Sequence, residues 1–384
     1  MILVVVPSAP DGAAAVSPAR VVAGLPLLTR IVRAATAAGY EHVFVRDAGP
    51  ATRDLLGGTG AVVLTTSTPL PPLSKRRIVV VAANVVPQSR WLRALLEMPI
   101  EPERLYVDGA CAMAIETERA GEILRAATRA PSAAALVAEL ARVFARQALP
   151  LTADGRFPLA SAGDVATAET WLLRSLIKRN EGFMSRHFER RISLAITRRL
   201  VATPVTPNIM TLTSVALGLA GAPFFLSPAP AFQVTGALLL LTHSVLDGCD
   251  GELARLKFQQ SRVGAMLDYW GDNVVHVAVF VCIAIGWALS AGTAWPLGLG
   301  AVAAAATLGS AALMFAHTAE DRAVGAESPG AARLTAALAN RDFIYVVIVL
   351  AAFGKVSWFL AATAVGGPAF LLVALWNRYH GRLR

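Results

Sequence analysis

Charged residues and cysteines are both scarce in this chain of 384 residues. Only 16% of the residues are charged, whereas soluble domains contain roughly a quarter, so a wholly soluble protein is not expected. The three cysteines form no C-x-x-C pair, which argues against a disulfide scaffold or a structural zinc site. The opening run Met1–Pro7 is short and has no basic lead. It does not resemble a signal peptide, and we interpret it as a buried strand.

Hydrophobic residues and positive charge are abundant instead. Hydrophobic residues make up 55% of the chain, and the formal net charge is +9. This combination suits a protein embedded in a membrane that meets an anionic surface and anionic substrates. Nucleic acid is not an expected partner, because the basic residues cluster beside hydrophobic segments and lack interleaved stacking aromatics.

Four aspartates lie at helical spacing across two hydrophobic stretches. Asp247 and Asp250 are three residues apart, and Asp268 and Asp272 are four apart, so each pair shares one face of a helix. Carboxylates in such segments are costly unless they have a partner or an ion. Oxygen ligands suit Mg²⁺ or Mn²⁺ better than zinc. The spacing therefore indicates a divalent-metal site that handles phosphate, the alternative being helix caps at a membrane surface.

The full pattern D-x2-D-G-x2-A-R-x8-G-x3-D-x3-D resembles the signature of the CDP-alcohol phosphotransferases. The resemblance implies a six-helix membrane enzyme that uses two divalent cations, Mg²⁺ or Mn²⁺. Such enzymes transfer a substituted phosphate from a CDP-alcohol to a second alcohol and release CMP. Implied metal ligands are Asp247, Asp250, Asp268 and Asp272, with Asp272 also the general base. Implied contacts of the nucleotide are Asp250, Gly251, Ala254, Arg255, Gly264 and Asn208.

Six apolar segments follow residue 206 and are expected to be membrane spans. They run over 208–226, 231–250, 265–289, 294–317, 341–354 and 356–377, several near the roughly 20 residues that cross a bilayer. Alternate loops are almost uncharged, whereas the others contain several arginines and a lysine. By the positive-inside rule, we expect the N-terminal domain, the aspartates and the C-terminus on the cytoplasmic side of the inner membrane. His243 and His276 are expected to be packed, hydrogen-bonded residues.

Residues 171–205 form a basic, amphipathic junction. Apolar residues recur at Phe188, Ile192 and Ile196, which predicts a helix at the lipid headgroups. We expect most of its arginines to anchor the chain at the membrane. Alternatively, one or two of them neutralise a phosphate on the acceptor or donor. The candidates are Arg191, Arg198 and Arg199. The segment 181–193 resembles the junction of fused synthases of phosphatidylinositol phosphate and of di-inositol phosphate solutes.

Residues 1–170 are expected to form an α/β domain. Strands are predicted at Ile2–Val6, Val43–Val45 and Ile78–Ala83, and helices at Leu27–Ala38, Ser89–Leu96, Glu116–Thr128 and Ser132–Gln147. This alternation indicates a mostly parallel sheet.

The α/β domain resembles nucleotidyltransferases around Ser17–Leu28 and along the strand that ends at Asn84. Asn84 stands where that family usually has a metal-binding aspartate, and the loop after the first strand has a single glycine, Gly12. We therefore expect a catalytically degenerate domain.

The sequence thus favours a CDP-alcohol phosphotransferase with domains at 1–170, 171–205 and 206–384. CDP-diacylglycerol is the favoured donor, and a polar or phosphorylated alcohol such as inositol phosphate the acceptor, with a homodimer possible. One alternative is a bifunctional enzyme whose N-terminal domain makes CDP-inositol for a soluble di-inositol phosphate product. Another, of a different class, is a cation-coupled transporter.

Overall fold

The chain forms two compact units, Met1–Arg174 and Ser175–Arg384. A computed structural model describes residues 1–8, 16–46, 50–68, 76–109, 112–152, 154–177, 184–324 and 343–381. The junction helix expected at 171–205 belongs mainly to the second unit.

A seven-stranded sheet forms the centre of the first unit. Its strand order is β10-β8-β9-β6-β1-β4-β5. The strands are β1 (Ile2–Val6), β4 (His42–Arg46), β5 (Val62–Leu64), β6 (Arg76–Ala82), β8 (Arg104–Val107), β9 (Met113–Thr117) and β10 (Ala145–Ala148). Neighbouring strands are parallel except around β9, which is antiparallel to both β6 and β8. The sheet is therefore mostly parallel, as expected for alternating strands and helices.

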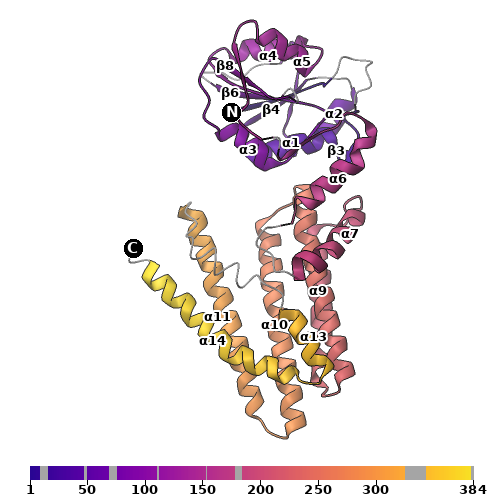
Figure 1. Cartoon of the computed structure of the whole chain (residues 1–384), viewed down its shortest axis with the longest axis vertical. Coiled ribbons are helices and arrows are strands. Elements are labelled where there is room, and N and C mark those ends of the chain that lie inside the picture. The colour runs from indigo at the N-terminus through magenta and orange to yellow at the C-terminus, as the bar shows by residue number, and fades with distance from the viewer. Residues whose placement is uncertain are drawn as a thin grey trace. The chain divides into compact units, whose positions relative to one another are not determined.

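Helices cover both faces of this sheet. They are α1 (Leu27–Ala38), α2 (Pro50–Leu56), α3 (Ser89–Glu97), α4 (Ala120–Arg129), α5 (Ala133–Leu140) and α6 (Val165–Arg174). In Figure 1, α4 and α5 lie on one side of the sheet and α1, α2 and α3 on the other. Two small antiparallel pairs complete the unit, β2 (Val21–Val22) with β3 (Leu25–Pro26), and β7 (Val85–Pro87) with β11 (Arg156–Pro158). The α/β architecture predicted for this part of the chain is confirmed.

Two helix predictions in the first unit extend too far. The helix expected from residue 116 begins at Ala120, because Glu116 and Thr117 belong to β9. The helix expected over 132–147 ends at Leu140, and Ala145–Ala148 forms β10. Alanine-rich sequence has a helical tendency, but β10 pairs in parallel with β8. Pairing with a distant strand overrides that local preference.

The second unit is helical. It contains a π-helical turn, η2 (Ser185–Glu189), a 3₁₀ turn, η3 (Ala222–Leu226), and the helices α7 (Arg190–Leu200), α8 (Pro207–Gly221), α9 (Pro230–Lys257), α10 (Arg262–Ala291), α11 (Trp295–Val324), α13 (Phe343–Ala352) and α14 (Val356–Gly381). In the described part of the chain, four helical stretches are long and apolar enough to cross a membrane, namely 207–226, 262–291, 295–316 and 356–376.

The other two expected spans also fall on helices. The second span lies within α9, which has 28 residues, but polar residues such as His243 and Asp247 lower its hydropathy. The fifth falls on α13, an apolar helix of only 10 residues. Residues 325–342, which include the first two residues of the expected fifth span, lie outside the described residues, as do Arg382 and Arg384.

A short turn joins α9 to α10 and sets their directions. α9 ends at Phe258, whose backbone adopts the left-handed conformation with φ of 55°. Ser261 caps α10, because its Oγ accepts a hydrogen bond of 2.9 Å from the backbone N–H of Gly264. The end of α9 and the start of α10 therefore lie at the same end of the helical unit.

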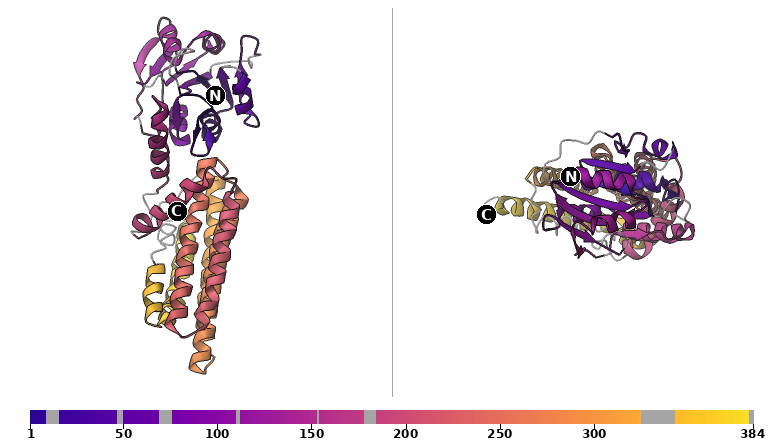
Figure 2. Two further views of the ribbon diagram at one scale, coloured as in Figure 1. Left: turned by 90° about the vertical axis from the view of Figure 1, so that its right-hand side faces the viewer. Right: turned by 90° about the horizontal axis from the view of Figure 1, so that it is seen from above.

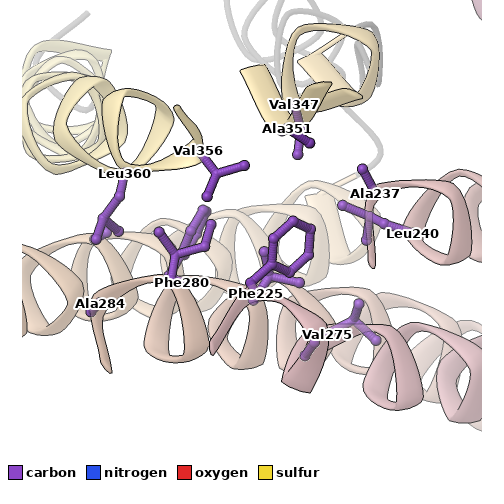
Figure 3. Close-up of a cluster of buried hydrophobic side chains, with 14 residues drawn as sticks. Phe225, Ala237, Leu240, Val275, Phe280, Ala284, Val347, Ala351, Val356 and Leu360 are labelled. Atoms are coloured by element: carbon purple, nitrogen blue, oxygen red, sulfur yellow. The ribbon is translucent and has the colours of Figure 1, made fainter. Parts of the chain in front are cut away.

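A buried apolar cluster packs the helices of the second unit together. Figure 3 shows Phe225, Val275 and Phe280 among side chains of the cluster, which also includes Val347 and Leu360. The helices also approach closely where side chains are small. A Cβ built on Gly236 of α9 would lie 3.0 Å from the carbonyl oxygen of Gly221 in α8. Figure 2 shows the long helices of this unit running side by side.

Candidate metal centre

Three of the four aspartates meet between α9 and α10. One carboxylate oxygen from each of Asp247, Asp250 and Asp268 lies within 4.8 Å of the other two. Asp247 and Asp250 are buried, and Asp268 is half-buried. The two helices thus bring together carboxylates that are at least 18 residues apart in sequence.

This arrangement fits a divalent cation. Carboxylates packed against one another repel, and taking such charges out of water is costly without a counter-charge. The donor atoms are all oxygens, which are the ligands that Mg²⁺ and Mn²⁺ prefer. Asp272 lies near enough to Asp250 and Asp268 for its charge to act on both. All four predicted aspartates therefore belong to one electrostatic cluster.

Thr211 fixes the orientation of Asp250. This buried threonine of α8 donates a hydrogen bond from its hydroxyl to Oδ2 of Asp250. Thr211 precedes Asp250 by 39 residues in sequence and lies outside the motif, so the motif alone does not indicate this contact. The only indication in the sequence was that Thr211 is a polar residue within an apolar span.

His243 contacts Asp272. Its Nε2 lies 3.4 Å from Oδ1 of Asp272, and its Nδ1 lies 2.9 Å from the carbonyl oxygen of Ser214. A carbonyl oxygen can only accept, so the hydrogen of that contact lies on Nδ1. The ring is buried, and a Cβ on Gly218 would lie 3.1 Å from it. His243 is the packed, hydrogen-bonded residue expected, and it also touches the predicted base.

The residues predicted to contact the nucleotide lie around this cluster. Gly251, Ala254 and Arg255 share the face of α9 that contains Asp247 and Asp250, by helical spacing. The guanidinium of Arg255 lies over Gly251, where a Cβ would be 3.2 Å from Nη1.

Asn208 and Gly264 are brought together from the starts of α8 and α10. A Cβ on Gly264 would lie 2.9 Å from Oδ1 of Asn208. The Asn208 side chain is otherwise exposed. Two residues that the motif and the helix start indicated separately are thus neighbours in space.

The three predicted acceptor arginines lie on the exposed side of α7. Arg191, Arg198 and Arg199 are all exposed, and the structure does not bring them to the aspartates. The arginine that reaches α9 is Arg190, whose Nη1 lies 2.9 Å from Oε1 of Glu252. Sequence reasoning missed this pair, because the basic residues of the junction look equivalent until the packed face of α7 is known.

Two of the polar side chains noted in the first unit, Asn84 and Asp108, have partners within the protein. The amide Nδ2 of Asn84 donates a hydrogen bond of 2.8 Å to the carbonyl oxygen of Leu159. Asp108 and Arg156 form an ion pair of 2.8 Å with both side chains largely buried. The guanidinium of Arg156 also lies over the ring of Trp91. Asn84 therefore has a structural role in this unit.

Known proteins resemble the second unit most clearly. Residues 204–376 match the family model described as CDP-alcohol phosphatidyltransferase. A bifunctional IPC transferase and DIPP synthase of Rubrobacter xylanophilus is 33% identical over 224 residues, which are 57% of this chain and 48% of that protein. Its namesake in Thermococcus kodakarensis is 36% identical over 122 residues, 32% of this chain and 27% of that protein. Residues 204–376 are therefore similar to the CDP-alcohol phosphatidyltransferase family.

These matches leave much of the relatives uncovered. The matched segments span less than half the length of either relative. Among solved structures, the phosphatidylinositol phosphate synthase of Mycobacterium tuberculosis with CDP-DAG bound is 22% identical, with a TM-score of 0.35. That match covers 48% of this chain and 94% of the synthase, and the similarity is weak.

Proposed function

We propose that this chain, whose residues 204–376 are similar to the CDP-alcohol phosphatidyltransferase family, transfers a substituted phosphate from a CDP-alcohol to a second alcohol and releases CMP. The observation that supports the proposal is the set of carboxylates held within 4.8 Å of one another by α9 and α10. This set coincides with the family motif, within residues 204–376.

Each aspartate has a role in this proposal. Asp247, Asp250 and Asp268 would hold Mg²⁺ or Mn²⁺, with Asp272 completing a site for two ions. Bound there, the cations would supply positive charge against the diphosphate and the leaving group. Thr211 keeps Asp250 in place through its hydroxyl. Gly251, Ala254 and Arg255 contact the nucleotide, as do Asn208 and Gly264.

The reaction exchanges a phosphoanhydride bond for a phosphoester bond. The acceptor hydroxyl oxygen attacks the phosphorus that carries the donor alcohol, forming a new O–P bond. The bond from that phosphorus to the bridging oxygen of the diphosphate breaks, and CMP leaves with the electron pair. Asp272 takes the proton of the hydroxyl, and transfer concerted with attack suits a carboxylate that is otherwise a weak base. His243, when protonated at both ring nitrogens, holds the carboxylate of Asp272 through the 3.4 Å contact of its Nε2.

CDP-diacylglycerol is the donor that we favour, with a polar or phosphorylated alcohol such as inositol phosphate as acceptor. Arg191, Arg198 and Arg199 are candidates for the acceptor phosphate. The relatives named bifunctional IPC transferase and DIPP synthase favour a second candidate, a soluble di-inositol phosphate product. In that case the first unit would make CDP-inositol.

For the first unit itself, we propose a nucleotidyltransferase-like fold without catalytic activity. Asn84, where a metal-binding aspartate would be needed, donates its amide hydrogen to Leu159. In the second unit we propose six spans in the inner membrane, with the N-terminal domain, the active site and the C-terminus cytoplasmic. We further propose that the protein forms a homodimer. A measurement of the mass of the protein in nanodiscs tests this proposal.

The proposal is tested by CMP release from the full chain in lipid nanodiscs with Mg²⁺. CDP-diacylglycerol and CDP-inositol are supplied separately, each with a panel of polyols and polyol phosphates. Release with the lipid donor is the expected result, and release with CDP-inositol alone would favour the second candidate. No release with any pair, together with cation uptake in proteoliposomes, would favour a transporter instead. Pyrophosphate release from CTP would contradict the proposal that the first unit is inactive.

A further inference from the structure

A buried glutamate lies on the face of α9 that points away from the aspartates. Glu252 is fully buried, and it follows Asp250 by two residues, which is about 200° around a helix. Its Oε1 accepts hydrogen bonds from Nη1 of Arg190 at 2.9 Å and from Oγ of Ser193 at 2.7 Å. Its Oε2 accepts one from Oγ1 of Thr197 at 2.6 Å. All three donors come from α7.

The three donors share one face of α7, and that face is polar. They are spaced by three and four residues, so they form a single stripe. Apolar residues of the junction point elsewhere, since Phe188 of η2 is 47% exposed and Ile192 of α7 is 39% exposed. A helix that only anchored the chain in lipid would need no buried acid. The polar stripe therefore specifies contact with α9.

The contact reaches the backbone of α9 beside the aspartates. A Cβ on Gly248 would lie 2.9 Å from Nη1 of Arg190. Gly248 adjoins Asp247 and lies one helical turn before Glu252. On the other side of α9, the hydroxyl of Thr211 holds Asp250. The segment 247–252 is thus held from two sides, by α7 and by α8.

We propose that Glu252 and Arg190 are positioning residues for the metal-binding carboxylates. Their buried pair fixes the rotation of α9, and with it the directions of Asp247 and Asp250. The helix α7 is then a part of the catalytic unit and more than a membrane anchor. This inference rests on the proposed function, because it assigns the aspartates to a cation.

The test measures Mn²⁺ affinity by electron paramagnetic resonance, alongside kcat for CMP release, on the full chain in nanodiscs. Glu252→Gln is expected to weaken Mn²⁺ binding by about tenfold and to lower kcat by about tenfold or more, as losses of residues that orient ligands do. Donor KM should rise as well, because Gly251, Ala254 and Arg255 share with Asp247 and Asp250 the face of α9 whose rotation the pair fixes. Arg190→Lys, which keeps the charge, should recover part of what Arg190→Met loses.

Two further variants separate positioning from stability. Thr197→Val removes one donor at constant shape while Arg190 still balances Glu252, so it should fold and show a smaller loss of the same kind. Leu360→Ala, in the apolar cluster, should lower the melting temperature without changing Mn²⁺ affinity.

Normal Mn²⁺ affinity and kcat in Thr197→Val and Glu252→Gln, with only a lowered melting temperature, would overturn the inference. If Glu252→Gln does not fold, the Mn²⁺ affinity and kcat of Thr197→Val test the inference. If the wild-type protein binds Mn²⁺ but releases no CMP, the proposed function is wrong, and the Mn²⁺ affinities of the variants still test the positioning role.

Discussion

Carboxylates have different neighbours in the two units of this chain. In the first unit, Asp108 lies 2.8 Å from the guanidinium of Arg156. In the second, Asp247, Asp250 and Asp268 lie within 4.8 Å of one another. An acid beside a base is neutralised by the protein itself, whereas three acids together need charge from outside. Proximity of carboxylates to one another therefore indicates a cation-binding site better than the burial of each carboxylate does.

The same contrast separates two acids within the second unit. Glu252 is more deeply buried than Asp250, but it accepts three hydrogen bonds from one neighbouring helix. Burial alone would rank Glu252 first as a functional residue. The three hydrogen bonds from α7 show that the Glu252 carboxylate has protein donors for both of its oxygens.

The largest effect is expected from changing the proposed base. Asp272→Asn removes the proton acceptor at nearly constant shape, and kcat for CMP release should fall by about 10² to 10⁴-fold. Mn²⁺ should still bind at the three remaining aspartates. Turnover close to that of the wild-type protein would remove Asp272 from the role of base.

Breaking the ion pair of the first unit should affect stability alone. Arg156→Met leaves Asp108 buried beside an apolar side chain, which should cost about 3 kcal/mol or more. A lowered unfolding transition of the first unit is expected, with CMP release per folded molecule unchanged. A loss of CMP release by the folded variant would show that the two units act together in catalysis, and the contrast between them would not hold.

A smaller effect on catalysis is expected from the histidine beside the base. His243→Leu removes the contact to Asp272 and the one to the Ser214 carbonyl, so kcat should fall by about 10- to 100-fold. Val347→Ala, in the apolar cluster, is a control for loss of packing. Equal losses in the two variants would mean that His243 acts only through packing.

The smallest effect is expected where α10 approaches α8. Gly264→Ala places a methyl group 2.9 Å from Oδ1 of Asn208, an exposed side chain that can move aside. We expect donor KM to rise by about 2- to 10-fold, which corresponds to roughly 0.4 to 1.4 kcal/mol of binding free energy. An unchanged donor KM would remove Asn208 and Gly264 from the nucleotide site.

The aspartate cluster could be predicted from sequence because helical periodicity and the motif fix which residues share a face. Contacts from helices outside the motif could not be predicted in this way. Thr211 and Ser214 reach Asp250 and His243 from α8, and their partners are set by how helices pack. The same limit applies to Arg190, which is distinguished from Arg191 only by the face of α7 that meets α9.

In the first unit, strand and helix propensities were sufficient for β1, α1 and β6 but not for β10. The segment Ala145–Ala148 has a local preference for helix, and its pairing with Arg104–Val107 determines its conformation. The α/β class could therefore be predicted, whereas the edge of the sheet could not. Long-range pairing is the physical reason for this difference.

The central claim is that the aspartate cluster uses a bound cation to release CMP. The most direct measurement is CMP release from CDP-diacylglycerol by the full chain in nanodiscs, after removal of cations with EDTA and again after addition of Mn²⁺. The Asp268→Asn variant is measured in parallel. We predict no release without cations, full recovery with Mn²⁺ in the wild-type protein, and little recovery in Asp268→Asn. Release that persists in EDTA, or equal recovery in the variant, would contradict the claim.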